Sequence, residues 1–297
     1  MDVNPQNLRS IYTGLSTAFN QRLAATATFY GRIAMEVPST GAKNEYPRLD
    51  DLPGFREWTG DRLIHDVSAN VFEIVNREFE KTIGIDRTKI EDDSFGIFSP
   101  VAAQMGQDTA QFPDQLAFGL LKQGASKICY DGQYFFDTDH PSYNSEGQEV
   151  AASNYTAGTN PAWYLIDDTQ VTRALVYQKR RPFKLLSLTR PEDPNVFNQK
   201  RFIYGVDGRC NVGFGIWQCA YMSRAELTTA NFEAARAAFQ SRCKRDGQPY
   251  ALTPRLLVVP PVLEGAARRV VGAALIAGGD TNVWAGTAEV VVVPHLG

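Results

Sequence analysis

The chain has 297 residues, of which 43% are hydrophobic and 21% are charged, and its formal net charge at pH 7 is −3. This composition is typical of a globular protein with a packed core, and it excludes a low-complexity or highly charged disordered chain. The small negative charge also gives no sign of the basic surplus that a domain needs when it neutralises many phosphates of a nucleic acid.

The cysteines and the apolar runs indicate the compartment in which the protein is made. The four cysteines are sparse and include no Cys-x-x-Cys pair, so we expect reduced thiols in a cytosolic compartment. No apolar run reaches the roughly 18 residues that a membrane-spanning helix needs, and the first residues do not open a cationic and apolar signal sequence. The sequence therefore predicts no membrane partner and synthesis in the cytoplasm.

The first predicted element is a helix that opens at Asn4-Pro5, where an N-cap residue precedes a proline at the first helical position. Apolar side chains then recur at helical spacing along one narrow stripe, namely Leu8, Ile11, Tyr12, Leu15 and Phe19. A helix with a single apolar face needs a partner surface that covers this face. We interpret residues 1–28 as an arm.

Residues 29–92 are predicted to form a long β excursion. Strand-like stretches at 29–37, 71–74 and 79–85 flank a polar middle that is rich in turn-forming residues. A two-stranded ribbon is only marginally stable in water, so the excursion should lean on another surface. Phe55 and Trp58 lie among the polar residues of this middle, and they either anchor the excursion on a partner or staple it to its own chain.

A long helix is predicted from Asp92-Asp93-Ser94 to Lys122, with carboxylates at the end where the helix dipole favours them. Pro113 lies inside this helix and should kink or split it, because proline lacks the backbone N–H and its ring clashes with the preceding turn.

The rest of the chain is predicted to be a mixed α+β body. One hairpin should turn at Asp131-Gly132 and another at Asp207-Gly208, since Asp-Gly is a strong turn pair. The other segments follow from turn residues and apolar spacing: a loop over 142–160, strands over 163–166, 174–178, 183–188, 256–259 and 288–293, and amphipathic helices over 232–243 and 263–275.

Residues that carry chemistry are thinly spread, with three histidines in the chain. Asp137, Asp139 and His140 could form a metal or acid–base cluster, or a structural turn in which the carboxylates cap backbone amides. Cys129 and His140 could form a thiolate–imidazole pair, but no third residue that would orient the pair stands out in the sequence. No zinc-ligand spacing, nucleophile elbow or phosphate-loop motif occurs. We expect no catalytic residue, cofactor or metal ligand, and hence no enzyme.

Charge is unevenly distributed between two segments. Residues 29–92 hold more acidic than basic residues, whereas residues 173–201 hold eight basic and two acidic ones. The basic cluster within them is Lys179, Arg180, Arg181 and Lys184. Three interpretations remain open: two solvated faces, an acidic excursion of one chain that lies over the basic strands of another, and a basic cluster that faces nucleic acid.

Several stretches resemble the Mu-like phage major head protein family, also called the gpT family. The longest is Cys129-Tyr130-Asp131-Gly132-Gln133-x-Phe135-Phe136-Asp137-x-x-His140-Pro141. The others are Trp58-x-Gly60-x-Arg62, Phe79-Glu80-x-Thr82-Ile83-Gly84-Ile85-x-Arg87, Glu91-Asp92-Asp93-x-x-Gly96-Ile97-Phe98, Trp163-Tyr164-Leu165, Gly213-Phe214-Gly215-x-Trp217-Gln218, and Val258-Val259-Pro260 followed by Leu263-Glu264. They run in order through nearly the whole chain, which makes the resemblance more specific than any single motif.

The resemblance implies the Hong Kong 97-type capsid fold, in the α+β class, and a division of the chain. It implies an N-terminal arm at 1–28, an extended β loop called the E-loop at 29–92, and a peripheral domain with a kinked spine helix at 93–160. The remaining peripheral strands and an axial domain follow at 161–297. No motif supports the covalent lysine–asparagine cross-link known in part of this fold group, so we expect a non-covalent shell.

The resemblance also implies a major head protein that self-assembles into hexamers and pentamers of an icosahedral shell enclosing double-stranded DNA. Its place would be the virion, after assembly in the bacterial host cytoplasm. The implied partners are other copies, a portal, a separate scaffold protein and DNA bound without sequence specificity. An encapsulin-like or other phage-derived shell protein is the alternative, and a soluble α+β enzyme is a more distant one. The expected inter-subunit contacts are Leu8, Tyr12, Phe19, Phe55, Trp58, Arg62, Lys179, Arg180, Arg181 and Lys184.

Overall fold

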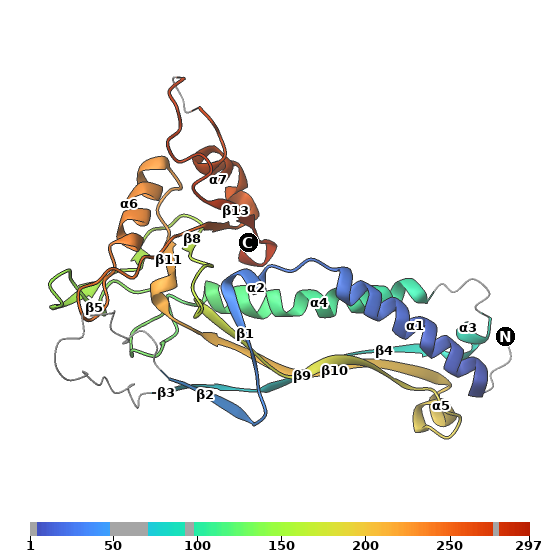
Figure 1. Cartoon of the computed structure of the whole chain (residues 1–297). Helices are drawn as coiled ribbons and strands as arrows, with labels where there is room; N and C mark the ends of the chain where they lie inside the picture. Colours follow the sequence, from blue (N-terminus) through green and yellow to red (C-terminus); the bar gives the residue numbers. More distant parts are fainter. Residues whose placement is uncertain (1–4, 48–70, 93–97, 276–278) are drawn as a thin grey trace.

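The computed structural model describes residues 5–47, 71–92, 98–275 and 279–297. A long, thin part carries a compact C-terminal part on one side (Figure 1). None of the helices in the described ranges combines the length and the hydropathy that crossing a membrane requires.

A four-stranded sheet forms the base of the long part, in the order β1-β9-β10-β4. The central pair, β9 (Leu175–Leu188) and β10 (Arg201–Phe214), is antiparallel, and the short helix α5 (Pro194–Gln199) lies between them in the chain. β1 (Ala34–Pro38) pairs parallel with β9, and β4 (Arg77–Asp86) pairs antiparallel with β10. Figure 1 shows α5 at the far end of this ribbon.

The hairpin predicted at Asp207-Gly208 is wrong, because β10 continues through this pair as one strand. Its register with β9 shifts on either side of Arg209, which marks a β-bulge rather than a turn. A Cβ at residue 208 would lie 2.6 Å from the ring of Phe183, so close packing requires the glycine. The strands predicted at 174–178 and 183–188 likewise form one strand, and Pro182 is tolerated because it lies in the bulged region.

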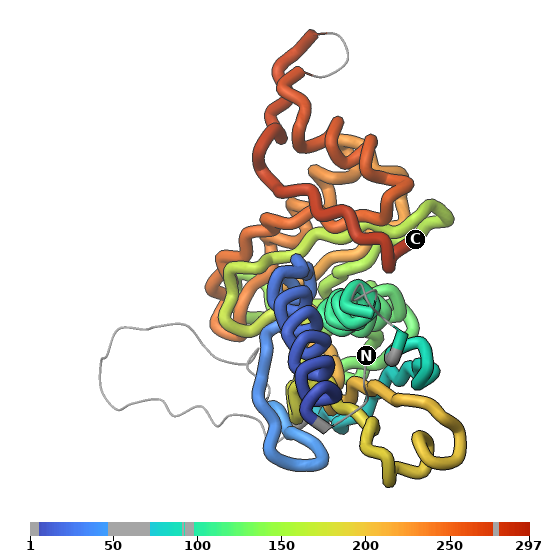
Figure 2. The backbone as a smooth tube through the Cα atoms, turned by 90° about the vertical axis from the view of Figure 1, so that its right-hand side faces the viewer, coloured from blue at the N-terminus to red at the C-terminus, as the bar shows by residue number. Residues whose placement is uncertain are grey.

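Two long helices cover one face of this sheet. α1 (Pro5–Ala25) lies beside α4 (Ser99–Lys122), as the end-on view shows (Figure 2). They approach so closely that a Cβ at Gly106 would lie 2.3 Å from the carbonyl oxygen of Phe19. Phe19 and Leu8 are buried in a core that also contains residues of α4 and of the sheet. The apolar stripe of the arm is therefore covered by its own chain, whereas the sequence predicted contact with a neighbouring subunit.

The spine helix begins later than predicted. α4 starts at Ser99 with Pro100 in its first turn, and the short helix α3 (Arg87–Glu91) precedes it. The helix is not split at Pro113 and continues to Lys122. Pro113 is buried, so tertiary packing around it offsets the backbone hydrogen bond that proline cannot donate.

A single helical turn, α2 (Tyr30–Ile33), forms where the sequence predicted the start of a strand. The backbone N–H groups of Phe29 and Tyr30 donate to the carboxylate of Asp114 on α4 at 2.9 and 2.6 Å. These amides open the helical turn and would otherwise lack partners, so Asp114 supplies the cap from a distant element. The sequence could not reveal a cap that lies 84 residues away.

The compact part is built on a five-stranded sheet in the order β13-β12-β8-β11-β7. Its strands are β7 (Tyr155–Thr156), β8 (Trp163–Ile166), β11 (Ala220–Ser223), β12 (Leu256–Val259) and β13 (Glu289–Val292). Apolar residues of α6 (Thr229–Gln240) and α7 (Glu264–Val271) share one core with this sheet. The 3-10 helices are η1 (Trp217–Cys219), η2 (Pro261–Leu263) and η3 (Pro294–Leu296).

The loop predicted over 142–160 is partly strand, because β5 (His140–Tyr143) pairs with β6 (Glu149–Ala152) and β7 follows. The turn predicted at Asp131-Gly132 is present, with the N–H of Gly132 bonded to the carbonyl of Cys129. Its flanks form an isolated bridge between Ile128 and Tyr134 rather than two regular strands.

A separate ribbon of β2 (Lys43–Pro47) and β3 (Val71–Val75) extends from the end of the sheet opposite α5 (Figure 1). Its root packs on β9 through a small core of Tyr46, Ile74 and Val176. Residues 48–70, which include the predicted contacts Phe55, Trp58 and Arg62, lie outside the described residues.

Candidate assembly surfaces and a buried polar cluster

The basic cluster lies on β9, and Lys179, Arg180, Arg181 and Lys184 are all exposed. The ammonium group of Lys179 lies 3.1 Å from the carboxylate of Glu36 on β1, and Arg181 pairs with Asp207 on β10. Two of the basic side chains therefore have acidic partners on their own chain. Both pairs are partly exposed, so each contributes only about 0.2–1 kcal/mol.

A buried polar network holds the root of the β2–β3 ribbon. Gln178 on β9 is fully buried, and its amide N–H groups donate to the carbonyl of Ile74 and to Oδ1 of Asn76 at 2.9 and 2.8 Å. Its oxygen accepts from the hydroxyl of Tyr46 at 2.9 Å. Asn76 in turn donates to the hydroxyl of Ser39 at 2.8 Å. Hydrogen bonds therefore set the direction in which the ribbon leaves the sheet, since they depend on geometry more strongly than apolar contacts do.

The contact residues predicted on the arm meet their own chain. The hydroxyl of Tyr12 donates to the carbonyl of Leu185 on β9 at 2.8 Å, and Leu8 and Phe19 are buried in the core that α1 shares with α4. Near the end of α1, the guanidinium of Arg22 donates twice to Gln107 on α4, at 3.0 and 2.6 Å. These contacts bind α1 to the long sheet and to the spine helix.

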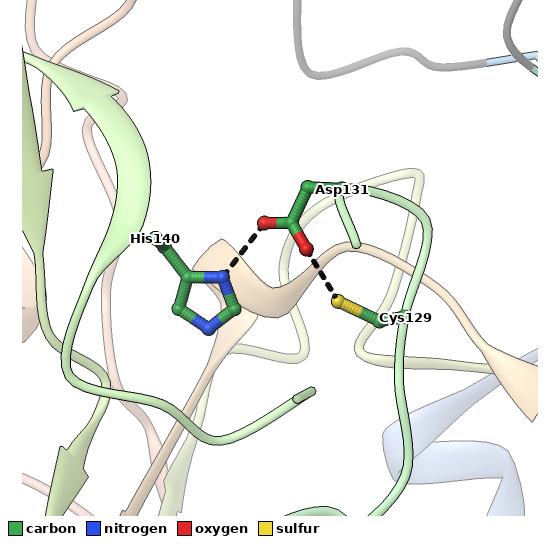
Figure 3. Close-up of side chains that lie close together, drawn as sticks. All are labelled: Cys129, Asp131 and His140. Atoms are coloured by element: carbon green, nitrogen blue, oxygen red, sulfur yellow. Dashed lines mark hydrogen bonds and ion pairs between the residues drawn. The ribbon is translucent and has the colours of Figure 1, made fainter. Parts of the chain in front are cut away.

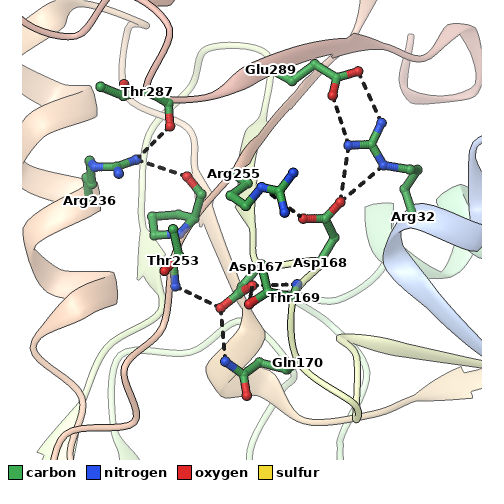
Figure 4. A network of polar contacts seen from close by, with 11 residues as sticks. Arg32, Asp167, Asp168, Thr169, Gln170, Arg236, Thr253, Arg255, Thr287 and Glu289 are labelled. Atoms are coloured by element: carbon green, nitrogen blue, oxygen red, sulfur yellow. Dashed lines mark hydrogen bonds and ion pairs between the residues drawn. The ribbon is translucent and has the colours of Figure 1, made fainter.

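An ion-pair network joins α2 to the compact part (Figure 4). Arg32 on α2 donates to Asp168 at 3.1 Å and to the two carboxylate oxygens of Glu289 on β13 at 3.1 and 2.9 Å. The hydrogen bonds with Glu289 raise the pKa of Arg32, and the same bonds lower the pKa of Glu289. The side chain of Asp168 is 10% exposed and that of Glu289 is 61% exposed, so the pair with Asp168 is better shielded from water.

The neighbouring Asp167 is fully buried and organises the loop after β8. Its carboxylate accepts from the N–H of Thr169 at 2.7 Å and from the N–H of Thr253, just before β12, at 2.8 Å. Arg236 on α6 donates to the carbonyl of Pro254 at 2.9 Å (Figure 4). Asp167 and Arg236 thus bind together segments that surround the Arg32 network. No motif in the sequence pointed to this joint.

The turn after α4 holds a cluster of Cys129, Asp131 and His140 (Figure 3). The thiol of Cys129 donates to Oδ1 of Asp131 at 3.0 Å, and Nδ1 of His140 lies 2.7 Å from Oδ2 of the same carboxylate. Oδ1 also accepts from the N–H of Gln133 at 3.1 Å, which closes the turn. The side chains of Asp131 and His140 are 1% and 0% exposed. The cluster is therefore a buried tie across the turn.

Aromatic and cationic groups surround this cluster. The ring of His140 stacks on Trp217, with 4.1 Å between the centroids and 10° between the planes. The guanidinium of Arg242 lies 5.1 Å from the centroid of Trp217 and 4.6 Å from that of Phe239. Arg242 is buried and donates to the carbonyl of Gln218, and burial lowers its pKa to about 10.

The geometry favours a structural role for the cluster over a catalytic one. Burial and then the charge of Asp131 raise the pKa of the Cys129 thiol, so the thiol remains a hydrogen-bond donor. The carboxylate stands between the thiol and the imidazole, where it prevents His140 from taking the thiol proton directly. Burial raises the pKa of Asp131, but the hydrogen bonds from His140 and Cys129 outweigh it and lower that pKa overall.

Among the residues that the structure describes, the same three also form a group that could hold a metal ion. Their ligand atoms lie within 4.8 Å of one another, and they combine sulfur, oxygen and nitrogen donors. Their hydrogen bonds to one another already satisfy the carboxylate, the thiol and Nδ1, which agrees with the structural interpretation.

The sequence left two interpretations of Asp137 open, a metal or acid–base cluster and a structural turn, and the contacts of Asp137 agree with the structural turn. Its carboxylate accepts from the N–H groups of Thr138 and Tyr134 at 2.8 and 3.2 Å. The partner of His140 is Asp131 rather than Asp137 or Asp139, its close neighbours in the sequence. The sequence marked Asp131 through the Asp-Gly turn pair and through the longest family-like stretch, but neither signal identified His140 as its partner.

A family model covers nearly all of the chain. Residues 8–296 match the Mu-like prophage major head subunit gpT. The chain belongs to this family. It is 36% identical over 276 residues to the "Mu-like prophage FluMu major head subunit" of Haemophilus influenzae, and the match covers 91% of this chain and 90% of that protein. It is 35% identical over 305 residues to the "Major capsid protein" of Escherichia phage Mu, and the match covers 100% of both.

Solved structures of the bacteriophage JBD30 head share the fold of this gpT family member. A chain of the JBD30 procapsid is 39% identical and superposes with a TM-score of 0.88 over 99% of this chain and 100% of that chain. A chain of the JBD30 capsid is 30% identical, with a TM-score of 0.80 over 100% of both. The Hong Kong 97-type capsid fold expected from the sequence is thereby confirmed.

Proposed function

We propose that this chain is the major capsid subunit that self-assembles into the hexamers and pentamers of an icosahedral phage head enclosing double-stranded DNA. The observation that carries the proposal is the likeness to the JBD30 procapsid chain over 99% of this chain, at 39% identity. The full-length similarity to the capsid protein of phage Mu supports the same role. The protein acts by shape and contact, as a structural component of the virion and not as an enzyme.

We assign the segments of the subunit to the domains of the family's capsid fold. Residues 1–28 form the arm, 29–92 the E-loop, 93–160 the peripheral domain with its spine helix, and 161–297 the remaining peripheral strands and the axial domain. The long sheet under α1 and α4 supports the peripheral assignment, and the five-stranded sheet with α6 and α7 supports the axial one. The β2–β3 ribbon suits an E-loop, because it lies at the end of the long sheet opposite α5 and forms its own two-stranded sheet.

The partners are other copies of the chain, a portal, a separate scaffold protein and packaged DNA, with assembly in the bacterial host cytoplasm. Phe55, Trp58 and Arg62 of the E-loop anchor neighbouring subunits, together with the exposed basic side chains Arg180 and Lys184. Lys179 and Arg181 already have acidic partners on their own chain, so Arg180 and Lys184 are the better candidates for pairing with a neighbour. The arm residues Leu8, Tyr12 and Phe19 serve assembly by holding α1 on the long sheet and the spine helix.

Reversal of Arg180 and Lys184 to glutamate separates two roles of the basic cluster. Failure to form shells, with a folded subunit, supports a subunit contact. Normal empty shells that retain DNA poorly support a cluster that faces DNA. Unchanged shells and unchanged DNA content exclude both roles and leave a solvated face.

Electron cryo-microscopy of particles from cells that make the chain with its accompanying head proteins tests the function. We expect closed icosahedral shells with this chain in hexamers and pentamers, and nuclease-protected DNA in complete particles. Shells that enclose proteins instead of DNA would point to an encapsulin-like compartment, and small uniform particles would contradict both shell functions.

A further inference from the structure

Asp168 lies between two arginines, Arg32 and Arg255, as Figure 4 shows. Arg32 donates through Nε and Nη2 to Oδ2 of Asp168 at 3.2 and 3.1 Å. Nε of Arg255 lies 3.8 Å from Oδ1, which is close enough for an ion pair but too far for a hydrogen bond. The carboxylate is therefore bonded to one arginine and faces a second one.

The two oxygens of this carboxylate are unequally satisfied. The side chain of Asp168 is 10% exposed, and Oδ1 is buried without a hydrogen-bond partner among the residues that the structure describes. A buried acceptor without a donor costs free energy, and a shielded carboxylate that loses its cation costs more. Asp168 can therefore release Arg32 without a large cost only if another donor takes its place, and Arg255 stands beside it.

Arg32 is fastened to the long part of the subunit. The carboxylate of Asp114 on α4 caps the start of α2, and Nη1 of Arg173, just before β9, donates to the carbonyl of Gly31. α2 leads directly into β1, which pairs with β9. A shift of α4 and β9 relative to the compact part would therefore carry Arg32 with it.

Arg255 is fastened to the compact part, together with Asp168. Its backbone N–H donates to the carbonyl of Ile166 on β8 at 3.1 Å, and its carbonyl accepts from the N–H of Glu289 on β13 at 2.7 Å. Asp168 follows the end of β8 by two residues. The backbones of Arg255 and Asp168 therefore stay close together when α2 moves. The side chain of Arg255 is 56% exposed, which leaves it free to rotate toward Oδ1.

We propose that Asp168 exchanges its partner when a procapsid becomes a mature shell, from Arg32 in the procapsid to Arg255 in the mature shell. The exchange rests on the proposed capsid function and adds a conformational switch to it. This chain superposes better on the JBD30 procapsid chain than on the JBD30 capsid chain, which agrees with the Arg32 pair as the procapsid arrangement.

The exchange keeps the shielded carboxylate paired in both arrangements. Each arrangement is thereby a defined state, because an arginine in either position satisfies Asp168. The second pair of Arg32, with Glu289, adds little to the barrier, since the side chain of Glu289 is 61% exposed and water replaces the lost partner.

Electron cryo-microscopy of procapsids and of mature heads built from this chain shows the exchange directly. We expect hydrogen bonds between Asp168 and Arg32 in procapsids, and between Asp168 and Arg255 in mature heads. A pair with Arg32 that persists in mature heads overturns the proposal. A mature head in which neither arginine bonds to the carboxylate overturns it as well.

Two substitutions with opposite effects test the exchange in solution. Arg32→Ala removes the cation of the procapsid arrangement, so we expect its procapsids to convert to mature shells about tenfold faster on mild heating. Arg255→Ala removes the cation of the mature arrangement, so we expect conversion to be about tenfold slower. Arg268→Ala is the matched control, at a 65% exposed position that pairs with Glu264 on the same helix, and it should convert at the unaltered rate.

The direction of the two shifts decides the outcome. Conversion that is faster in both variants, slower in both, or unchanged in both overturns the exchange, and the capsid function stands because shells have formed. If an alanine variant forms no procapsids, Arg32→Lys and Arg255→Lys replace it, since lysine keeps the charge but not the paired N–H donors, and the same directions are expected. If the unaltered chain forms no shells with its head proteins, the capsid function fails, and the exchange fails with it.

Discussion

Gln178 shows how one buried side chain can orient a whole extension. It is an amide on the long sheet whose donors and acceptor all meet residues at the root of the β2–β3 ribbon. A leucine of similar size would fill the space but would leave the carbonyl of Ile74 and the polar atoms of Asn76 and Tyr46 without these partners. The cost of leaving buried polar groups unpaired is larger than the gain from the added apolar contact.

We expect Gln178→Leu to lower the free energy of unfolding by about 1–3 kcal/mol. Urea unfolding followed by circular dichroism measures it, with Gln21→Leu on the exposed face of α1 as the control. Equal stability of the two variants would show that the network does not hold the ribbon.

Asp131 couples the stability of its turn to pH. Hydrogen bonds from His140 and Cys129 lower its pKa in the folded state, although burial opposes them. An aspartate in the unfolded chain titrates near pH 3.9. Because the folded pKa is the lower one, the stabilisation is complete above that pH and is lost as the pH falls through the folded pKa.

We therefore expect Asp131→Asn to be less stable than the unaltered chain at pH 7, with a difference that shrinks below about pH 4. Unfolding curves at pH 7, 4 and 3 measure this, and Asp139→Asn at an exposed position nearby is the control. A constant difference at all three values would contradict the pH coupling.

The sequence located the turn at Asp131-Gly132 but did not identify the residue that pairs with Asp131. Asp131-Gly132 was recognised as a turn pair, and the capping role of Asp137 was one of two alternatives. The pairing of Asp131 with His140 depends on the path of the chain into β5, and the cap that Asp114 provides for α2 spans the E-loop and the first part of the spine helix. Contacts of this kind follow from tertiary structure and leave no local pattern.

The contact between α2 and the compact part depends on one guanidinium group, that of Arg32, which pairs with two carboxylates. Arg32 meets Asp168, which is nearly buried, and Glu289, which is largely exposed. Removal of the arginine leaves the shielded carboxylate without its closest cation, whereas removal of the exposed carboxylate leaves the better-shielded pair intact. Loss of the pair with Asp168 should therefore cost more free energy of unfolding than loss of the pair with Glu289.

We expect Arg32→Ala to cost about 1–3 kcal/mol and Glu289→Gln at most about 1 kcal/mol. Thermal or urea unfolding compares the two variants, and hydrogen exchange over α2 and β1 reports whether the joint loosens. An equal or larger effect of Glu289→Gln would show that Asp168 does not carry the joint.

At the element scale, local pattern predicted β8, β12, β13 and α6 close to their observed bounds. It failed at Asp207-Gly208, where the need to pack Phe183 against a glycine turned a typical hairpin pair into a bulge in a long strand. It also failed to place the start of α4, since acidic residues at 91–93 favour a helix start but do not require one. Long-range packing overrode local preference in both cases.

The described part of the subunit has two large cores, and a smaller core holds the β2–β3 ribbon on the long sheet. α1 belongs to the second core, so the arm needs no neighbour to order it. In the described residues, the β2–β3 ribbon contacts the sheet through the Gln178 network and a small apolar core of Tyr46, Ile74 and Val176. Motifs spread along the chain predicted the fold and the family. Both the arm and the β excursion were predicted to need a partner surface, although α1 finds this surface on its own chain. An apolar stripe shows that a helix face is covered, but it does not show which surface covers it.

No motif in the sequence supports the covalent lysine–asparagine cross-link that occurs in part of this fold group. We therefore expect protein from intact shells, boiled in detergent with a reductant, to migrate as a monomer on a gel. A ladder of multimers that survives this treatment would contradict a non-covalent shell.

Hydrogen exchange measured on dispersed subunits and on assembled shells tests whether the β2–β3 ribbon, unlike α1, depends on neighbouring subunits for its stability. A two-stranded ribbon by itself is marginally stable, so the amides of β2 and β3 should exchange quickly in the subunit and be strongly protected in the shell. The amides of α1 should be protected to a similar degree in both. Equal protection of β2 and β3 in the two states, or protection of α1 that appears only in the shell, would contradict the account.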